Sequence, residues 1–272
     1  MQNKKEKVKN TEVRKFLNLI ISNKENLRKN LSILKQGKKS IKKGVYLGKN
    51  VKIEPNVFFD TNEGEITIGD NTEIKAFSVL RGPLSIGHNC IINSFAEISH
   101  SQIGNVCKIG GEIKESIMAE YSNKQHHGFL GHSYVGKWVN IGAGTNVSNL
   151  KNTYGSIKMA GINTGQQFLG CIIGDFTKIA INTTIFCGKV IGVSSHLYGT
   201  INADVPSFVS QIDSKNLYEI PVVIAEKIQK RMALRRGVKF TNTDHIKFKK
   251  LFKETALERK RAKVKKGKLL FR

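Results

Sequence analysis

Acidic residues are scarce in this sequence, which has 21 Asp and Glu against 45 Lys and Arg and a formal net charge of +24. The excess of positive charge is confined to the two ends of the chain. Residues 1–44 hold 14 basic and 3 acidic side chains and residues 211–272 hold 19 and 6, whereas residues 45–210 hold 12 of each sign. Segments of one charge are most often solvated surface, and they can also bind RNA, anionic lipid or an acidic protein. The composition predicts a neutral central domain between two basic segments.

Cysteine is also rare, and long apolar runs are absent. The four cysteines, Cys90, Cys107, Cys171 and Cys187, form no C-x-x-C pair and stand where small side chains are needed, which favours reduced packing residues. The most apolar stretch near the start, residues 16–21, is too short and too polar for a signal peptide or a membrane span. We therefore expect a cytoplasmic protein.

Both basic segments have apolar residues at helical spacing. Residues 11–35 predict an amphipathic helix or helix pair that packs on the end or side of the central domain, with membrane-surface binding as the alternative. Pro221 suits the first turn of a helix over 222–234, and Thr243 or Asp244 can cap a second helix. The predicted divisions are a helical segment over 1–44, a central domain over 45–210 and a helical segment over 211–272.

The central domain is defined by a six-residue repeat. From Leu47 onward an aliphatic residue recurs at about every sixth position, often followed by Gly and, four positions on, by a small or β-branched residue, as in Ile68-Gly69 with Thr72 and Ile103-Gly104 with Cys107. Each hexapeptide forms one flat face of a coil, with the aliphatic side chain pointing inward and Gly in the turn. Three faces make a turn of about 18 residues, and stacked turns bury a continuous core. The pattern predicts an all-β parallel β-helix flanked by helices, without fixing its hand.

The repeat is interrupted at residues 120–128 and 149–154, with a weaker break at 160–166. We expect loops there, because a rigid scaffold with excursions at its corners is a common way to present binding and catalytic groups.

Several motifs resemble one family of hexapeptide acyltransferases. They are SNKQHHGFLG (122–131), VGKWVNIGAGT (135–145) and SNL (148–150), together with GGEIK (110–114), GCIIGD (170–175) and INT (181–183). These stretches are similar to the acetyltransferase domain of the bacterial bifunctional glucosamine-1-phosphate acetyltransferase / N-acetylglucosamine-1-phosphate uridyltransferase, and closer to a divergent branch of it. The resemblance covers about residues 44–261. It implies a left-handed β-helix, a homotrimer, and acetyl-CoA as co-substrate for transfer to the amine of an amino sugar.

The resemblance also implies roles for particular residues. His126 matches the general base, for which an imidazole with an ordinary pKa of ~6.5 is suited. Asn140 and Asn149 match amides that orient the sugar or the acetyl group, with Asn140 counted among the catalytic residues. Gly142 and Ala143 match part of the CoA groove. The cations expected at the sugar phosphate are Lys114, Lys124, Arg81 and Lys158. Each could instead be an ordinary loop, corner or surface residue.

Two departures from the family pattern concern the substrate and the second activity. Phe129 and Leu150 stand where the family commonly has tyrosines whose hydroxyls help to bind the phosphate, which leaves the identity of the amino sugar open. The sequence shows no nucleotidyltransferase domain and no phosphate-cradling glycine loop in residues 1–44, so uridylyl transfer is not expected.

Two other functions compete with acetyl transfer. The γ-class carbonic anhydrases share the architecture and bind zinc through histidines, for which His127 and His132 have a suitable spacing and His100 or His88 could complete the set. The surrounding motifs match the acetyltransferase instead, so we expect no metal. The third possibility is a non-catalytic scaffold whose basic ends bind RNA, lipid or a protein partner.

Overall fold

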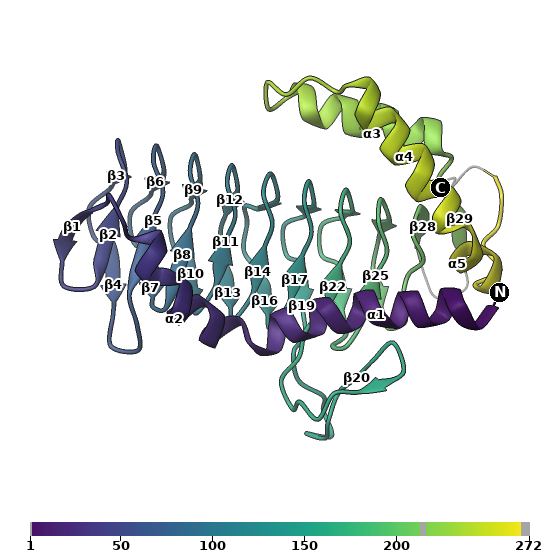
Figure 1. Ribbon diagram of the computed structural model, residues 1–272, viewed down its shortest axis with the longest axis horizontal. Helices are drawn as coiled ribbons and strands as arrows, with labels where there is room; N and C mark the ends of the chain where they lie inside the picture. Colours follow the sequence, from purple (N-terminus) through teal and green to yellow (C-terminus); the bar gives the residue numbers. More distant parts are fainter. Residues whose placement is uncertain (1, 213–215, 268–272) are drawn as a thin grey trace.

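The computed structural model describes residues 2–212 and 216–267, which form a long solenoid with helices along one side and over one end (Figure 1). Each turn of the solenoid contributes one short strand to each of three sheets. Neighbouring strands pair in parallel throughout the solenoid, and the antiparallel pairs are β1–β2, β20–β21 and β28–β29. The predicted fold class, an all-β left-handed parallel β-helix with flanking helices, is confirmed.

The three sheets differ in their number of strands. The nine-stranded sheet contains β1 (Lys39–Lys42), β2 (Val45–Leu47), β5 (Ile66–Ile68), β8 (Leu84–Ile86), β11 (Gln102–Ile103), β14 (Ile117–Met118), β17 (Tyr134–Val135), β22 (Ile172–Ile173) and β25 (Val190–Ile191). The ten-stranded sheet contains β3 (Lys52–Ile53), β6 (Glu73–Ile74), β9 (Ile91–Ile92), β12 (Lys108–Ile109), β15 (Asn123–Lys124), β18 (Asn140–Ile141), β23 (Lys178–Ile179), β26 (His196–Leu197), β28 (Val209–Gln211) and β29 (Leu217–Glu219). The eight-stranded sheet contains β4 (Phe58–Asp60), β7 (Val79–Arg81), β10 (Glu97–Ser99), β13 (Glu112–Lys114), β16 (Phe129–Gly131), β19 (Asn146–Val147), β24 (Thr184–Ile185) and β27 (Thr200–Ile201).

The repeat residues form columns along the inside of the solenoid. In the ten-stranded sheet the parallel register places Ile74, Ile92 and Ile109 one above another, and all three are fully buried. Burying an isoleucine side chain stabilises the fold by about 1.5–3 kcal/mol, so stacked columns of this kind supply most of the core. The interpretation of the aliphatic positions as inward-facing is confirmed.

Each turn bends at three corners, which position the functional side chains. The first corner joins the nine- and ten-stranded sheets, the second joins the ten- and eight-stranded sheets, and the third leads from the eight-stranded sheet to the next turn. The glycine that follows many repeat residues lies at the first corner. A Cβ on Gly69 would lie 2.6 Å from the backbone carbon of Gly87, so the spacing of the turns leaves no room for a side chain.

The N-terminal helices α1 (Gln2–Ile21) and α2 (Asn23–Leu34) lie along the solenoid as a strap (Figure 1). Val13, Leu17 and Ile20 of α1 are buried against Ile172 and neighbouring residues of the nine-stranded side. The prediction that this segment packs on the side of the central domain is confirmed. No helix within residues 2–212 and 216–267 combines the length and the apolar character that crossing a membrane requires.

The C-terminal helices are α3 (Val222–Leu234), α4 (Asn242–Glu254) and α5 (Ala256–Arg261) (Figure 1). They begin at the far end of the solenoid, and α3 and α4 extend back over its turns, where Arg236 donates to Asn123 of β15. The cap of α4 differs from the prediction. Thr241, rather than Thr243 or Asp244, is the N-cap, and Asp244 completes a capping box by accepting from the Thr241 backbone. Phe248 of α4 packs with Phe176 and Phe208 in a separate small core.

The predicted loop over residues 120–128 is wrong. This stretch continues the solenoid as β15, and Lys124 takes the inward position that an aliphatic residue occupies in the turns on either side. The other two predicted breaks belong to one excursion at the third corner, which contains the hairpin of β20 (Lys158–Met159) and β21 (Ile162–Asn163) and projects from the solenoid (Figure 1).

Candidate functional site

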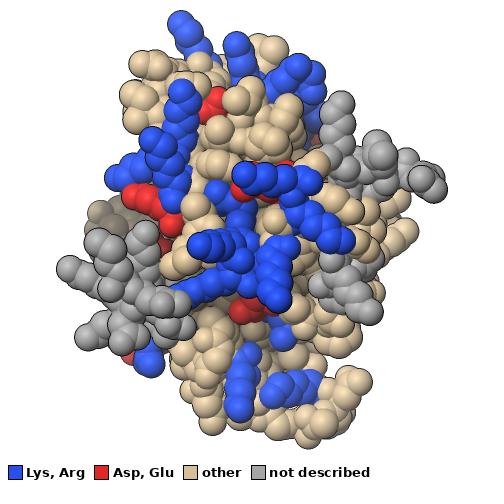
Figure 2. Space-filling view, turned by 90° about the vertical axis from the view of Figure 1, so that its right-hand side faces the viewer, with Lys and Arg blue, Asp and Glu red and all other residues tan. Residues whose placement is uncertain are grey.

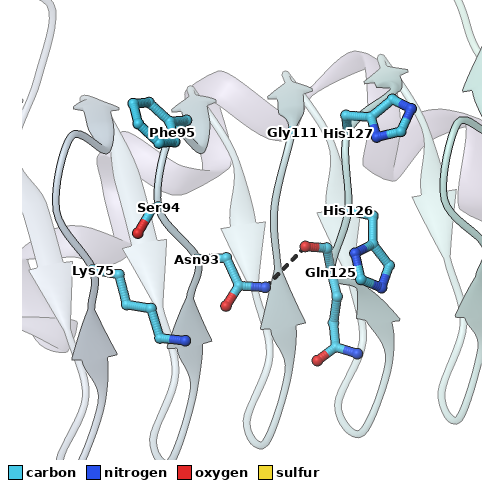
Figure 3. Close-up of a pocket in the computed structure, with 8 residues that line it drawn as sticks. All are labelled: Lys75, Asn93, Ser94, Phe95, Gly111, Gln125, His126 and His127. Carbon is cyan, nitrogen blue, oxygen red and sulfur yellow. Dashed lines mark hydrogen bonds between the residues drawn. The ribbon is translucent and has the colours of Figure 1, made fainter.

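His126 lies at a hollow of about 480 Å³ in the second corner of the solenoid (Figure 3). The residues that line the hollow come from successive turns: Lys75, Asn93, Ser94, Phe95, Gly111, Gln125, His126 and His127. His126 and His127 are both exposed. The site therefore arises from the stacking of turns that are 15–18 residues apart in the sequence.

The hollow exists because one turn of the corner has no side chains. Gly110 and Gly111 occupy that turn, and Cβ atoms there would lie 2.1 Å from the Gln125 carbonyl oxygen and 2.8 Å from the Gly128 carbonyl oxygen. Gly111 also has a φ of +68°, which favours glycine. The two glycines thus form a floor that is recessed between the neighbouring turns.

Side chains on the two neighbouring turns form the walls. Phe95 stands on one side and His127 on the other, two strand spacings or about 10 Å apart along the solenoid. Phe95 also stacks on Phe77 of the preceding turn, with ring centroids 5.3 Å apart, and both rings are exposed. This arrangement offers an apolar surface opposite the two imidazoles.

The polar groups of the hollow lie below the aromatic wall (Figure 3). Asn93 Nδ2 donates to the Gln125 carbonyl oxygen at 2.8 Å and so spans the glycine turn. Lys75 is the cationic side chain in the lining, and its ammonium group extends toward Asn93 (Figure 3). The hollow can therefore hold a polar, anionic molecule close to His126.

Lys124, which the resemblance assigned to the sugar phosphate, lies inside the solenoid. Its side chain is 1% exposed, and its ammonium donates to the carbonyl oxygens of Gly110 at 3.0 Å, His126 at 3.1 Å and Gly128 at 2.7 Å. An ammonium has three N–H donors, so these carbonyls use all of them. This geometry contradicts the prediction that Lys124 binds a phosphate.

The other residues predicted to bind the substrate lie at the third corner, across the eight-stranded sheet from His126. Lys114 is exposed at the end of β13, in register with Ser99 and Gly131. Asn149 Nδ2 donates to His132 Nδ1 at 2.9 Å. Lys158 is exposed on the projecting hairpin. A single chain does not bring these side chains to the hollow.

Arg81 also lies at the third corner, where its guanidinium is already paired. Arg81 Nη1 lies 3.2 Å from a carboxylate oxygen of Asp60, and its Nε lies 3.3 Å from one of Glu97. Hydrogen bonding from the Asn62 backbone and the nearby Arg81 lower the pKa of Asp60 below its usual value. A phosphate at Arg81 would have to compete with two carboxylates.

The predicted CoA-groove residues continue the second corner beyond the hollow. Gly142 and Ala143 lie in the turn after His127, and a Cβ on neighbouring Gly144 would lie 3.5 Å from His127 Nε2. Asn140 is placed differently, on the outer face of the ten-stranded sheet in register with Asn123 and Lys178. Asn140 accepts a long hydrogen bond of 3.4 Å from Asn123 and does not line the hollow.

The histidines of the zinc hypothesis are distributed over all three corners of the chain. His88 lies at the first corner beside Asp70, His127 at the second, and His100 and His132 at the third. Burial lowers the pKa of His132, with Glu115 acting in the opposite direction. Within the described parts of the chain, no three His, Cys, Asp or Glu side chains are grouped in a way that could hold a metal ion.

Sequence reasoning missed Lys75, Asn93, Phe95 and Gln125, although a signal was present. Lys75, Asn93, Gly110 and Gln125 each follow the inward residue of a ten-stranded-sheet strand, and the registers of β6, β9, β12 and β15 set them side by side. Aligning the repeats turn by turn would have placed them next to His126.

A second candidate surface is the end of the solenoid that the C-terminal helices cover. Figure 2 shows Lys and Arg side chains gathered on this end, with few acidic side chains among them. The exposed cations of α4, α5 and the segment after α5 are Lys247, Lys249, Lys250, Lys253, Lys260, Arg261, Lys263, Lys265 and Lys266. The last residues of the predicted basic segment, 268–272, lie outside the described residues.

Comparison with known proteins agrees with the architecture and with the resemblance of the motifs. The family described as "Bacterial transferase hexapeptide (six repeats)" matches residues 65–100. This match spans 36 of the 272 residues. The chain is 31% identical over 164 residues to the bifunctional sugar-1-phosphate nucleotidylyltransferase/acetyltransferase of Sulfurisphaera tokodaii, and the alignment covers 57% of the chain and 39% of the relative. It is 32% identical over 166 residues to the bifunctional protein GlmU of Marinobacter nauticus, and this alignment covers 59% of the chain and 33% of the relative.

The chain thus spans about two fifths or less of the length of these curated relatives. Among solved structures, AntD, an N-acyltransferase from Bacillus cereus in complex with dTDP and 3-hydroxybutyryl-CoA, is 18% identical to the hexapeptide-repeat chain. That match has a TM-score of 0.30 and covers 68% of this chain and 89% of AntD. The resemblance that the sequence motifs indicated is confirmed by the relatives at about 30% identity.

Proposed function

We propose that this protein is an acetyl-CoA-dependent N-acetyltransferase that acts on an amino sugar phosphate or a related sugar. The observation that carries the proposal is an exposed imidazole, His126, at the edge of a glycine-floored hollow that also contains a lysine. The name of the Sulfurisphaera tokodaii relative includes acetyl transfer and a sugar-1-phosphate, which supports this substrate class.

In the proposed reaction the amine of the sugar attacks the thioester carbonyl carbon of acetyl-CoA. A C–N bond forms, the C–S bond breaks, and the electron pair of that bond leaves with the CoA sulfur. His126 accepts the proton that the amine loses, and the imidazolium returns it to the thiolate or to water. A general base of this kind typically contributes 10²–10⁴-fold to the rate.

The hollow suggests where each substrate binds. We place the acceptor over Gly110 and Gly111, with a sugar face against the Phe95 ring and the phosphate near Lys75. Gly142 and Ala143, one turn beyond His127, leave the backbone open for the pantetheine arm of CoA, because small residues allow a ligand to approach the main chain. His126 would then stand between the acceptor and the thioester.

We further infer a homotrimer in which the site is shared. Lys114, Asn149, Arg81 and Lys158 lie at the third corner of the chain, so a neighbouring copy must bring them if they contact the same substrate. A solenoid with flat faces can pack around a threefold axis so that the third corner of one copy meets the second corner of the next. Three equivalent sites would result.

Incubation of the purified protein with acetyl-CoA and a panel of amino sugar phosphates and nucleotide-linked amino sugars tests the activity directly. We expect release of free CoA thiol that depends on one acceptor and on an intact His126. Thiol release without an acceptor would indicate hydrolysis. No release with any amino sugar, together with binding of an anionic polymer, would favour the scaffold function.

The basic end of the solenoid supports this second candidate. Exposed lysines on α4 and after α5 form a surface that suits an anionic partner such as RNA, anionic lipid or an acidic protein. The surface lies away from the hollow, so both functions can coexist. Cys90, Cys107, Cys171 and Cys187 are all free, which supports a reducing compartment such as the cytoplasm.

A further inference from the structure

Lys124 breaks the rule that the inward positions of the solenoid are apolar. Its neighbours in the same column are Ile109 in the preceding turn and Ile141 in the following one, both buried. Transfer of an ammonium from water into a protein core is unfavourable unless its donors find partners. An isoleucine or methionine at this position would fill the column without that cost.

The partners of Lys124 are the backbone of the hollow itself. The Gly110 carbonyl belongs to the glycine floor, and the His126 and Gly128 carbonyls belong to the turn that carries both histidines. One ammonium therefore links the floor to the wall from beneath. Gly111 lies directly above it, since a Cβ on this residue would be 2.8 Å from Lys124 Nζ.

The charge of Lys124 is retained at neutral pH. Burial lowers its pKa to about 8, and the nearby Glu112 carboxylate acts in the opposite direction. A charged donor forms stronger hydrogen bonds to carbonyl oxygens than a neutral amine does.

We propose that Lys124 is a positioning residue that holds the 126–128 turn against the glycine floor and so fixes the direction of the His126 imidazole. This inference rests on the proposed function, because it assigns to Lys124 the geometry of the general base. Lys124 does not contact the substrate in this arrangement, since its side chain is enclosed in the core.

A second lysine provides a matched control. Lys178 also donates to two backbone carbonyls, those of Trp138 at 2.9 Å and Phe176 at 2.7 Å, and burial lowers its pKa to about 7. These carbonyls belong to first-corner turns, and Lys178 does not line the hollow. Lys178→Met removes a carbonyl-bound ammonium of the same kind elsewhere in the solenoid.

The experiment compares Lys124→Met and Lys178→Met with the full-length protein in three measurements. Hydrogen exchange is followed at the amides of Glu112 and Gly144, which donate to the Gly128 and His127 carbonyls and therefore report on the turn. Steady-state kinetics with the acceptor found in the panel give kcat and KM separately. Thermal unfolding reports on stability.

For Lys124→Met we expect exchange at these amides to accelerate at least tenfold. We also expect kcat to fall about 10–100-fold, because a misdirected imidazole loses part of the rate enhancement that a general base supplies. KM should stay within threefold of the wild-type value. The unfolding temperature should change little, because the better fit of methionine in an apolar column is offset by the loss of the donor to the Gly110 and His126 carbonyl oxygens. Lys178→Met should leave both exchange and kcat at the wild-type values. A purely structural role would instead lower stability and activity together.

The proposal is overturned if Lys124→Met folds and shows wild-type exchange at Glu112 and Gly144 with kcat within threefold. Equal losses of kcat in both lysine variants would overturn it as well. If Lys124→Met does not fold, Lys124→Gln, which keeps an N–H donor, is compared with Lys178→Gln in the same way. Should the wild-type protein release no thiol with any acceptor, the proposed function fails, and the exchange measurement still decides whether Lys124 holds the turn.

Discussion

The second and third corners of the solenoid are built from the same repeat, yet they present different chemistry. At the second corner, two glycines leave a hollow beside His126, and the exposed Phe95 and Lys75 complete its lining. At the third corner the polar side chains largely engage one another, as Arg81 does with Asp60 and Glu97. The second corner is open around an exposed imidazole, whereas the third corner holds the cations predicted to bind phosphate and the Asn149 amide.

In the proposed arrangement, a single chain carries two halves of a site rather than one complete site. The strands of the eight-stranded sheet, such as β16 (Phe129–Gly131), separate the two corners by three residues, or about 10 Å. The two halves cannot come together within one chain, because the eight-stranded sheet lies between them and would have to break. A neighbouring copy related by threefold symmetry can bring them together, and the following predictions test this arrangement.

The largest expected effect comes from the base at the second corner. His126→Ala should lower the rate of acetyl transfer about 10²–10⁴-fold, equivalent to about 3–5 kcal/mol of barrier, because the proposed general base is lost. CoA binding and thermal stability should be nearly unchanged, since the side chain is exposed. His127→Ala is the matched control and should remain active. If His127→Ala is the slow variant instead, the roles of the two histidines are exchanged.

The shared site itself is tested by mixing two impaired variants. Lys114→Met should raise KM for the phosphorylated acceptor about tenfold or more, because a charge-assisted contact to the phosphate is lost. If His126 and Lys114 of one site come from different copies, then refolding His126→Ala with Lys114→Met in equal amounts leaves about a quarter of the sites intact, by random assembly of symmetric trimers.

The mixed sample should therefore show about a quarter of the wild-type rate at low acceptor concentration, where His126→Ala is nearly inactive and Lys114→Met retains about a tenth of the rate or less. A rate no higher than the mean of the two variants would place both residues in the same subunit or remove Lys114 from the site. A monodisperse monomer in sedimentation with full activity would contradict sharing altogether.

The comparison of the corners also shows how far sequence reasoning reached. The six-residue period predicted that aliphatic residues such as Ile68 and Ile103 point inward, because apolar burial is what the repeat encodes. The same rule failed at Lys124, where it predicted a loop. Three backbone carbonyls solvate the ammonium inside the core, and these partners become visible only when the turns are stacked.

The candidate site was predicted in part for a related reason. His126 was found through a motif that is contiguous in the sequence. Lys75 and Phe95 belong to turns about 30–50 residues earlier and become neighbours of His126 only through the parallel register of the ten-stranded sheet. The same stacking places the predicted residues at two different corners. A motif in the linear sequence carries no information about this stacking.

A smaller effect is expected from the acceptor side of the hollow. Phe95→Ala should raise KM for the acceptor about 3–10-fold, because a stacking contact with the sugar is worth about 1 kcal/mol, and should leave KM for acetyl-CoA unchanged. Phe77→Ala, which removes the ring behind Phe95 but none of the lining, is the control and should have the weaker effect. Equal increases in KM for acetyl-CoA would assign this wall to the donor instead.

The smallest effect on turnover is expected at the first corner, to which we assign no catalytic role. Lys178 of β23, which is partly buried and binds carbonyls of this corner, should instead control the pH dependence of stability. Burial lowers the pKa of Lys178 to about 7, whereas in the unfolded chain it should have the ordinary value of about 10.4. Between these values the unfolded state binds more protons than the native state, so the contribution of Lys178 to the free energy of unfolding rises with pH. Between pH 7 and 10 the contribution of Lys178 therefore depends on pH, and Lys178→Met removes it.

At pH 7 the Lys178→Met variant should be more stable than the wild type by about 1–2 kcal/mol, and the difference should shrink as the pH approaches 10. Urea unfolding at fixed protein concentration at pH 7, 8 and 9.5 measures the difference, and the nearby His196 does not interfere because burial and Lys178 lower its pKa to about 4. A difference that stays constant over this range would mean that Lys178 is solvated, and a loss of kcat in Lys178→Met would mean that the first corner contributes to the site after all.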